Sequence, residues 1–398
     1  MANDLLTPDV IAKEALMQLD NNLVMGASVH REYKKEFKKV GESISIRKPV
    51  KFEVTDGADV TSHLQDITEQ STTLTVDKHK NVAFPLSTSD LALKIEEYSK
   101  RYITPAIISL ANQIDLDLLA CYKKVWAASG TAASTPAAFA TLGSCAQLMD
   151  DMAIPSHGRK LVCNPACNWS LADALKGSFD MTIAKDTVRA GFLGRVAGME
   201  INSVQNVRRH TAGTATGILV QAVGGVTYVT ASDKAATSTL YVDTGTGTLT
   251  VGDVITIADV YSVNPITRET TEHLQQFTVV TATTLDGTDD PVTVSPAIRT
   301  TGAYQTVNSV PADGASVTLV ASHTANLAFV RNAFALVTIP IEEIGQFGGV
   351  KMKTIDHNGL AITVTTGVDI LTLKAVIRLD IMYAADAIYP DLAVRLLG

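Results

Sequence analysis

The sequence predicts an α+β fold, in which a small all-β domain is inserted into a host domain that mixes helices with strands. Three observations lead to this prediction. A long apolar stripe at helical spacing begins near residue 104, helical and strand-like patterns alternate over residues 131–210, and the composition changes sharply over residues 211–325. With 398 residues, 46% of them hydrophobic, the chain is long enough for two or three domains with sizeable cores.

Composition and charge exclude several classes of protein. The chain has 33 Lys and Arg against 41 Asp and Glu, a net charge of −8, which argues against a protein whose main work is to grip nucleic-acid backbones. Four cysteines are too few for a disulfide framework, and the N-terminus lacks a secretory pattern, so we expect cytoplasmic synthesis. No apolar stretch is long enough to span a membrane. Only 19% of the residues are charged, which favours an oligomer.

The first element, residues 1–40, is predicted to be an N-terminal arm with one amphipathic helix. Thr7 and Pro8 are typical of a helix start, and apolar residues then recur on one helical face between residues 11 and 19. A basic stretch follows, because residues 30–53 hold eight Lys or Arg against four Glu. A solvated face with ion pairs along a helix is the favoured interpretation, and a partner-binding site is the alternative.

Residues 41–86 are predicted to form an extended two-stranded hairpin. Apolar and polar residues alternate over residues 43–54 and again over residues 73–76, and the tip between them, residues 56–70, has little apolar content. An isolated two-stranded ribbon is marginal in water. We therefore expect this hairpin to lie on another surface.

Residues 87–130 are predicted to hold the longest helix of the chain. It opens at Thr104 and Pro105 and runs to Gly130, roughly 36 Å at 1.5 Å per residue. We expect a separate helix before it, over residues 89–102. An apolar stripe of this length is typical of a helix that lies across a domain as its spine. The stripe consists of Ile107, Ala111, Ile114, Leu118, Tyr122 and Val125.

Residues 131–210 are predicted to form part of a mixed α/β domain, because a helical pattern over residues 140–152 precedes an apolar run at residues 160–163. Residues 211–325 differ: they hold three Lys or Arg against ten Asp or Glu, are rich in Thr, and repeat short strand signals. This pattern predicts a small all-β domain, a barrel or a sandwich. Since α/β patterning resumes over residues 326–398, the β domain is predicted to be inserted. The strand signals lie at residues 226–229, 239–242, 254–257, 277–280, 292–294 and 317–320.

The sequence offers no recognisable catalytic, cofactor or metal motif, and we predict no such site. Cys163 and Cys167 lack the second ligand pair of a structural zinc site, so buried thiols are favoured. The acidic run at residues 286–290 is favoured as a turn over a calcium loop. The glycines of residues 243–248 are favoured as a flexible hairpin tip over a phosphate loop. The eight His are scattered singly along the sequence.

Five segments resemble a known family. KLVCNPACNWSLADAL at residues 160–175, GFLGRVAGMEI at residues 191–201 and NLAFVRNAFALVTIPIE at residues 326–342 resemble the central domain of tailed-phage major capsid proteins with the HK-97-type fold. VGDVITIADVYSVNPITRE at residues 251–269 and LQQFTVV at residues 274–280 resemble the inserted β domain of the P-22-like coat proteins. The C-terminal tail is similar to that family as well, so the resemblance covers nearly the whole chain.

This resemblance implies a shell-forming subunit without catalysis. Its parts would be an N-terminal arm, an E-loop hairpin, a spine helix with part of the peripheral domain, an axial domain and an inserted β domain, with residues 326–398 completing the axial and peripheral domains. Copies would assemble through pentamers and hexamers into an icosahedral head around double-stranded DNA, without sequence-specific binding. A portal protein is an implied partner. A separate scaffolding protein is also expected, because no long, charge-rich helical segment precedes the arm. The implied location is the virion, after assembly in the bacterial cytoplasm.

The resemblance also implies which residues make contacts. We expect the hairpin, residues 44–82, to contact an adjacent copy, and a polar loop of the β domain, residues 231–247, to reach a neighbouring capsomer. The candidates for contacts between subunits are Arg47, Lys48, Lys51, Asp233, Lys234 and Asp243. The candidates for contact with a scaffolding protein are Arg31, Lys34, Lys35, Lys38 and Lys39.

Two other functions fit parts of the sequence. A cellular encapsulin-like shell protein uses the same fold to enclose a cargo enzyme, but the predicted β insertion favours a phage head. An enzyme or a Thr-rich glycan-binding protein is a rival of another class, which a monomer that binds a ligand would support.

Overall fold

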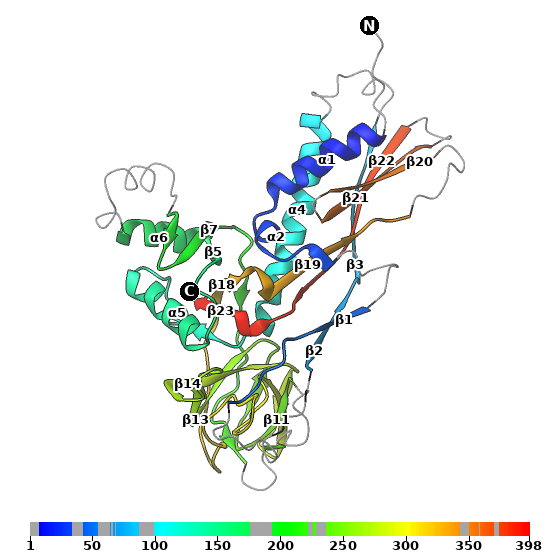
Figure 1. Ribbon diagram of the computed structural model, residues 1–398. Helices are drawn as coiled ribbons and strands as arrows, with labels where there is room; N and C mark the ends of the chain where they lie inside the picture. The colour runs from blue at the N-terminus through cyan, green and yellow to red at the C-terminus, as the bar shows by residue number, and fades with distance from the viewer. Residues whose placement is uncertain are drawn as a thin grey trace. The chain divides into compact units, whose positions relative to one another are not determined.

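The computed structural model of the protein describes residues 8–33, 43–54, 64, 67, 69–86, 99–175, 193–221, 226–227, 236–342, 350–357, 359–369 and 374–398. The chain divides into two units, shown in Figure 1. The first consists of Met1–Ser45, Thr73–Leu119 and Phe334–Ile388. The second consists of Ile46–Thr72, Ala120–Ala333 and Tyr389–Gly398.

The first unit contains a five-stranded antiparallel sheet in the order β19-β22-β21-β20, and β3 pairs with β22 as well. The long strand β22 therefore has three partners, two of which come from the C-terminal part of the chain. The strands are β3 (Lys78–Leu86), β19 (Phe334–Ile339), β20 (Lys351–His357), β21 (Leu360–Asp369) and β22 (Lys374–Ala387).

Two N-terminal helices pack within this unit. Helix α1 (Pro8–Asn22) contacts α4 and the strands β20 and β21, and α2 (Met25–Ser28) contacts α4. The predicted N-terminal helix is thus confirmed, since the apolar face that helical spacing indicated is buried. Its buried residues are Ile11, Ala12, Ala15, Leu16 and Leu19.

The spine helix is shorter than predicted. Helix α4 (Thr104–Leu119) spans 16 residues, about 24 Å, and a 3-10 turn over Ala120–Lys124 follows it. The chain then becomes extended, because the backbone of β4 (Ala128–Ser129) pairs with another strand rather than within a helix. The prediction of a separate preceding helix is wrong for its described end, since the π-helical turn Ser99–Ile103 continues directly into α4. Residues 89–98 lie outside the described residues.

The extended hairpin is confirmed in part. Strands β1 (Ser43–Arg47) and β2 (Ser71–Thr75) form a two-stranded sheet of their own. The alternation over residues 50–54 does not form a strand, because the chain there has no ladder partner among the described residues. Most of the tip, residues 55–63 included, lies outside the described residues.

The second unit contains a mixed sheet in the order β4-β23-β18-β5-β7-β6, with β8 pairing with β18. The predicted helix and strand of residues 140–163 are confirmed as α5 (Phe139–Asp151) and β5 (Arg159–Cys163), and α6 (Pro165–Leu175) follows. All four cysteines are buried, as favoured for Cys163 and Cys167. The remaining strands are β6 (Arg195–Val196), β7 (Met199–Ser203), β8 (Arg209–His210), β18 (His323–Val330) and β23 (Ala393–Leu397).

A second sheet of this unit is formed only by strands between residues 219 and 319. Its order is β10-β11-β16-β14-β13-β17, with β9 pairing with β11, and β12 pairs with β15 beside it. Its own apolar core includes Leu240, Ile257 and Phe277. Each predicted strand signal is found within the described residues, although residues 228–229 of the first lie outside them, and the domain limits at residues 211 and 325 stay a prediction. The strands are β9 (Leu219–Val220), β10 (Val226–Thr227), β11 (Ser238–Asp243), β12 (Gly247–Leu249), β13 (Val254–Val263), β14 (Thr270–Val279), β15 (Thr283–Leu285), β16 (Asp290–Ser295) and β17 (Val317–Leu319).

Two loop predictions for this region need correction. The expected polar loop over residues 231–247 is wrong in its second half, because alternating side chains of residues 238–243 are buried and form β11. The glycine-rich run at residues 243–248 is not a hairpin tip: it joins β11 to β12, whose partner is β15. The acidic run is a turn between β15 and β16, as predicted, with Gly287 at a φ of +88°.

Candidate assembly surfaces

Exposed apolar side chains gather on the segment between β1 and β2, which we call the arm (residues 48–70). Phe52 is 59% exposed, Val54 95%, Leu64 82% and Ile67 73%. Soluble monomers rarely expose several large apolar side chains in one short segment. Such exposure is typical of a surface that another molecule covers. The sequence had indicated a tip with little apolar content. Leu64 and Ile67 lie within that tip, and Phe52 and Val54 precede it.

Other residues of the second unit hold the base of the arm in place. The Arg47 guanidinium lies 2.9 Å from the Glu69 carboxylate, and the Arg47 carbonyl accepts a 3.1 Å hydrogen bond from the Tyr389 hydroxyl. The Lys48 ammonium lies 5.9 Å from the centre of the Tyr389 ring. Lys51 donates its backbone N–H to the Tyr304 hydroxyl at 3.3 Å. These contacts fix where the arm starts.

The six residues predicted to contact other subunits therefore differ in what the structure shows of them. Arg47, Lys48 and Lys51 all have partners within the same chain, and contact with a second copy stays a prediction for them. Asp243 ends β11 and is half-buried, and its Oδ1 has no hydrogen-bond partner among the described residues. Asp233 and Lys234 lie outside the described residues.

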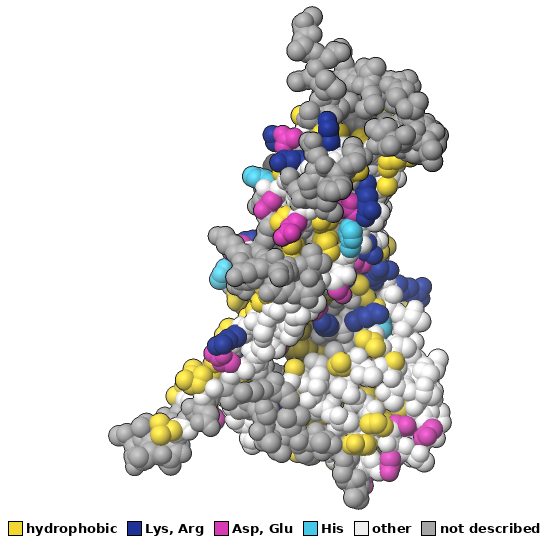
Figure 2. All heavy atoms as spheres, turned by 90° about the vertical axis from the view of Figure 1, so that its right-hand side faces the viewer, with side chains coloured by type: hydrophobic (Ala, Val, Ile, Leu, Met, Phe, Trp, Pro, Cys, Tyr) yellow, Lys and Arg dark blue, Asp and Glu magenta, His cyan; other side chains and the backbone are white. Residues whose placement is uncertain are grey.

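The face of the β-rich region (residues 211–325) that Figure 2 shows carries few charged side chains. In Figure 2, the lower right part of the face, formed by this region, is mostly white, because neutral polar side chains and backbone dominate it. A few Asp or Glu side chains interrupt it. Since residues 211–325 hold three Lys or Arg against ten Asp or Glu, the net charge of this region is negative, which disfavours contact with a nucleic-acid backbone.

Of the predicted scaffolding contacts, the structure describes only Arg31. This residue is 7% exposed, and its side chain donates from Nε to the Gly26 carbonyl at 2.7 Å and lies 2.8 Å from the Asp20 carboxylate. Arg31 thus holds the N-terminal segment together. The four lysines Lys34, Lys35, Lys38 and Lys39 lie outside the described residues.

Asp115 attaches the same N-terminal segment to helix α4. Its carboxylate is 3% exposed and accepts hydrogen bonds from the backbone N–H groups of Val24 (3.0 Å), Met25 (3.4 Å) and Gly26 (2.9 Å). Burial raises the pKa of Asp115, although the three N–H donors act in the opposite direction. The carboxylate supplies the acceptors that the start of the short helix α2 otherwise lacks.

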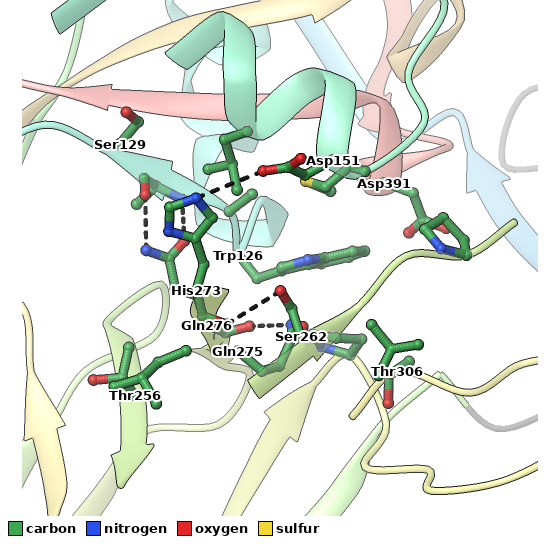
Figure 3. Close-up of a pocket in the computed structure, with 18 of the residues that line it drawn as sticks. Trp126, Ser129, Asp151, Thr256, Ser262, His273, Gln275, Gln276, Thr306 and Asp391 are labelled. Atoms are coloured by element: carbon green, nitrogen blue, oxygen red, sulfur yellow. Dashed lines mark hydrogen bonds and ion pairs between the residues drawn. The ribbon is translucent and has the colours of Figure 1, made fainter. Parts of the chain in front are cut away.

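The second unit contains a cavity of about 490 Å³, shown in Figure 3. The Trp126 ring lies at its centre, and α5, β13 and β14 contribute to its walls. His273 lies 3.6 Å from the Asp151 carboxylate, and the Gln276 amide group bonds to both the N–H and the C=O of Ala128. Within the described part of the chain, no group of three His, Cys, Asp or Glu could hold a metal ion. The cavity thus offers apolar surface and hydrogen-bonding groups, some of which are already paired.

A buried polar cluster in the second unit was missed from the sequence. The Tyr122 hydroxyl lies 3.0 Å from His210 Nδ1, and His210 Nε2 lies 2.7 Å from the Asp253 carboxylate. Arg395 is fully buried, with its guanidinium 5.1 Å from the centre of the Tyr122 ring, and His323 lies 5.3 Å from His210 between ring centres. Scattered residues meet here because β8, β18 and β23 are neighbours in one sheet. Single histidines far apart in sequence gave no signal of this convergence.

Burial and charge set the protonation of this cluster. Burial lowers the pKa of His323 to about 4, and the charge of Arg395 acts in the same direction. Burial also lowers the pKa of Arg395 to about 9. For Asp253, burial acts to raise the pKa, but hydrogen bonds from His210, Thr250 and Gly213 lower it overall.

Comparison with known protein families finds a match over the whole chain. The family model described as P22 coat protein, gene protein 5, matches residues 1–398. Comparison with curated protein sequences finds no match. Within the described residues, no helix is long and apolar enough to cross a membrane.

Several solved structures are similar at low sequence identity. A structure from Mycobacterium phage Che8 is 15% identical, covers 94% of this chain and 90% of its own, and has a TM-score of 0.48. The virus-like particle from Pyrococcus furiosus is 8% identical, covers 98% of both chains, and has a TM-score of 0.39. The CUS-3 coat protein I-domain is 30% identical over 28% of this chain and 96% of its own, with a TM-score of 0.18. Because the family model matches every residue from the first to the last, this chain belongs to the P22 coat protein family and is a bacteriophage major capsid protein.

Proposed function

We propose that copies of this chain assemble through pentamers and hexamers into an icosahedral head that encloses double-stranded DNA, and that the arm of each copy lies on a neighbouring copy. The observation that carries the proposal is the exposure of Phe52, Val54, Leu64 and Ile67 on one short segment. Full burial of such a side chain contributes about 1.5–3 kcal/mol, so covering several of them supports a stable contact. The capsid family supplies the partner, because every neighbour in a shell is another copy.

The test replaces apolar arm residues without touching the anchored base. We expect the double variant Phe52→Ser, Ile67→Ser to fold as the wild type does and to remain unassembled, as judged by circular dichroism and electron microscopy. Deletion of residues 56–70 should also prevent assembly, but it removes Glu69 and Gln70 from the base of the arm, so the double variant is the cleaner test. The control is Ile266→Ser, which changes a side chain that is 75% exposed outside the arm. Shells of normal yield from the double variant would refute the role of the arm.

The basic N-terminal stretch is proposed to bind a separate scaffolding protein during assembly in the host cytoplasm. Four lysines within six residues of sequence form a positive segment in a chain of net charge −8, which would attract an acidic surface. The test replaces Lys34, Lys35, Lys38 and Lys39 with Ala and leaves Arg31 in place, because Arg31 holds the fold. We expect co-purification with the scaffolding protein to be lost, while the circular dichroism spectrum is unchanged. Undiminished co-purification would refute this contact.

The enclosed cargo distinguishes the proposed phage head from an encapsulin-like compartment. A head of this kind also needs a portal protein for DNA entry. We expect particles purified from infected cells to contain double-stranded DNA and one portal assembly. Particles that hold only a protein cargo would favour the compartment.

A further inference from the structure

The buried polar cluster joins the two sheets of the second unit. Tyr122, His210, His323 and Arg395 belong to the region of the sheet β4-β23-β18-β5-β7-β6, whereas Asp253 and its neighbours belong to the sheet of residues 219–319. Within this cluster, three hydrogen bonds cross between the two sheets, in addition to those of Gln276 with Ala128 outside it. Arg395 Nη1 donates to the Gly252 carbonyl at 2.8 Å, Arg395 Nη2 donates to the Thr278 hydroxyl at 3.3 Å, and His210 Nε2 lies 2.7 Å from Asp253 Oδ1.

The cluster is balanced in charge when both histidines are neutral. His210 can then donate from Nε2 to Asp253 and accept from Tyr122 at Nδ1, which satisfies both ring nitrogens. Arg395 and Asp253 supply one charge of each sign. The two residues are also tied to backbone groups, since Asp253 accepts N–H bonds from Gly213 and Thr250.

His323 is the weak member of this cluster. It is 1% exposed, and its Nδ1 bonds to the Ala321 carbonyl at 2.8 Å, but its buried Nε2 has no partner among the described residues. A proton on Nε2 would thus create a donor without an acceptor. The charged and titratable groups around it are His210 on β8, Arg395 on β23 and Asp253 before β13. Tyr122, and Arg208 through Tyr122, complete the network.

We propose that this cluster is an acid-sensitive lock: protonation of His323 adds a second buried cation beside Arg395 and releases the sheet of residues 219–319 from β18 and β23, while each sheet stays folded. The direction follows from linkage. Because the pKa of His323 in the folded protein, about 4, lies below its ordinary value of 6.5, the neutral ring stabilises the closed form fully above pH 6.5. That stabilisation is lost progressively as the pH falls from 6.5 to 4.

Trp126 provides a built-in reporter of the release. It is 9% exposed and lines the cavity whose walls include β13 and β14 from one sheet and α5 from the other region. The chain has two tryptophans, and the second, Trp169, is 56% exposed on α6. A Trp169→Phe background therefore leaves Trp126 emission as the signal. We expect this emission to shift to longer wavelength as the pH falls from 6.5 to 4 in the unassembled subunit, while far-ultraviolet circular dichroism is retained.

The decisive comparison is His323→Asn in the same background, because the Asn amide can still donate to the Ala321 carbonyl but takes up no proton. We expect its transition to lie about one pH unit or more below that of the wild type. The exposed His157→Gln control should keep the wild-type midpoint. Equal midpoints in wild type and His323→Asn, or loss of circular dichroism in step with the emission shift, would overturn the proposal.

Hydrogen exchange on the wild type covers the case in which the Asn variant fails to fold. We expect the N–H groups of Gly213 and Thr250, which bond to Asp253, to lose protection between pH 6.5 and pH 4 after correction for the intrinsic exchange rate. Amides in the centre of β13 and β14 should keep theirs. Uniform loss of protection across the sheet would overturn the lock, since it indicates unfolding rather than release.

Discussion

Asp115 illustrates how single buried charges organise this protein. Its carboxylate lies on helix α4 and accepts three backbone N–H groups from a segment about 90 residues earlier. Helical spacing identifies the apolar neighbours Ile107, Ala111 and Ile114 as buried, and they are. The same spacing cannot indicate that an acidic residue of the helix is buried too, because its partners are set by the path of the chain before α4.

Removal of this carboxylate should destabilise the first unit. We expect Asp115→Ala to lower the free energy of unfolding by about 3 kcal/mol or more, because it leaves three buried donors without an acceptor. Asp115→Asn keeps one side-chain oxygen and should lie between Ala and wild type. Urea unfolding followed by circular dichroism measures the difference. Asp9→Ala is the control, since Asp9 forms an exposed ion pair with Lys13, and a comparable loss there would contradict the assignment.

Among the elements, those with strong local patterns were predictable. Helices α1 and α5 follow their predicted periodicity, as do the strands β10, β11, β13, β14, β16 and β17, whereas the short strands β9, β12 and β15 were not predicted. The end of α4 could not be predicted, because Tyr122 and Val125 continue the apolar stripe at helical spacing, whereas the backbone after Lys124 leaves the helix and forms β4. The alternation over residues 50–54 predicted a strand of the extended hairpin, but this segment has no ladder partner among the described residues and exposes Phe52 and Val54. Whether these apolar side chains are exposed depends on the tertiary fold, so it cannot be derived from the alternation of apolar and polar residues.

The glycine that opens β12 is an element-level requirement. Gly247 has a φ of +106°, and a Cβ added there would lie 2.6 Å from the Thr214 carbonyl oxygen. We expect Gly247→Ala to lower the free energy of unfolding by about 2 kcal/mol or more, because backbone strain and a clash with backbone combine. Gly302 has a φ of +82° with open space around it, so Gly302→Ala should cost only about 1 kcal/mol. Equal losses in chemical denaturation would show that the close approach to Thr214 is unimportant.

At the scale of the whole molecule, charge is distributed unevenly along the chain. Residues 30–53 hold eight Lys or Arg against four Glu, whereas residues 211–325 hold three against ten acidic residues. Composition therefore predicted regions with different roles, and the family match agrees with a subunit that is completed by other copies. Composition could not predict which charges face a neighbour. Arg47, Lys48 and Lys51, for example, all have partners in their own chain.

Acidic residues of the β-rich region (residues 211–325) are predicted to strengthen the contacts between capsomers. If Asp233 and Asp243 pair with basic residues of the next capsomer, the double variant Asp233→Ala, Asp243→Ala should form shells that dissociate at lower urea concentration than the wild type. Each exposed pair contributes only about 0–1 kcal/mol, but the contact repeats over the whole shell. The difference should narrow at 1 M salt, where the screening length falls to about 3 Å. The control is Asp313→Ala, which removes an exposed acidic residue of the same region. If the double variant and the wild type dissociate at the same urea concentration, or if their difference does not change with salt, the pairing is refuted, because charges between capsomers must respond to screening.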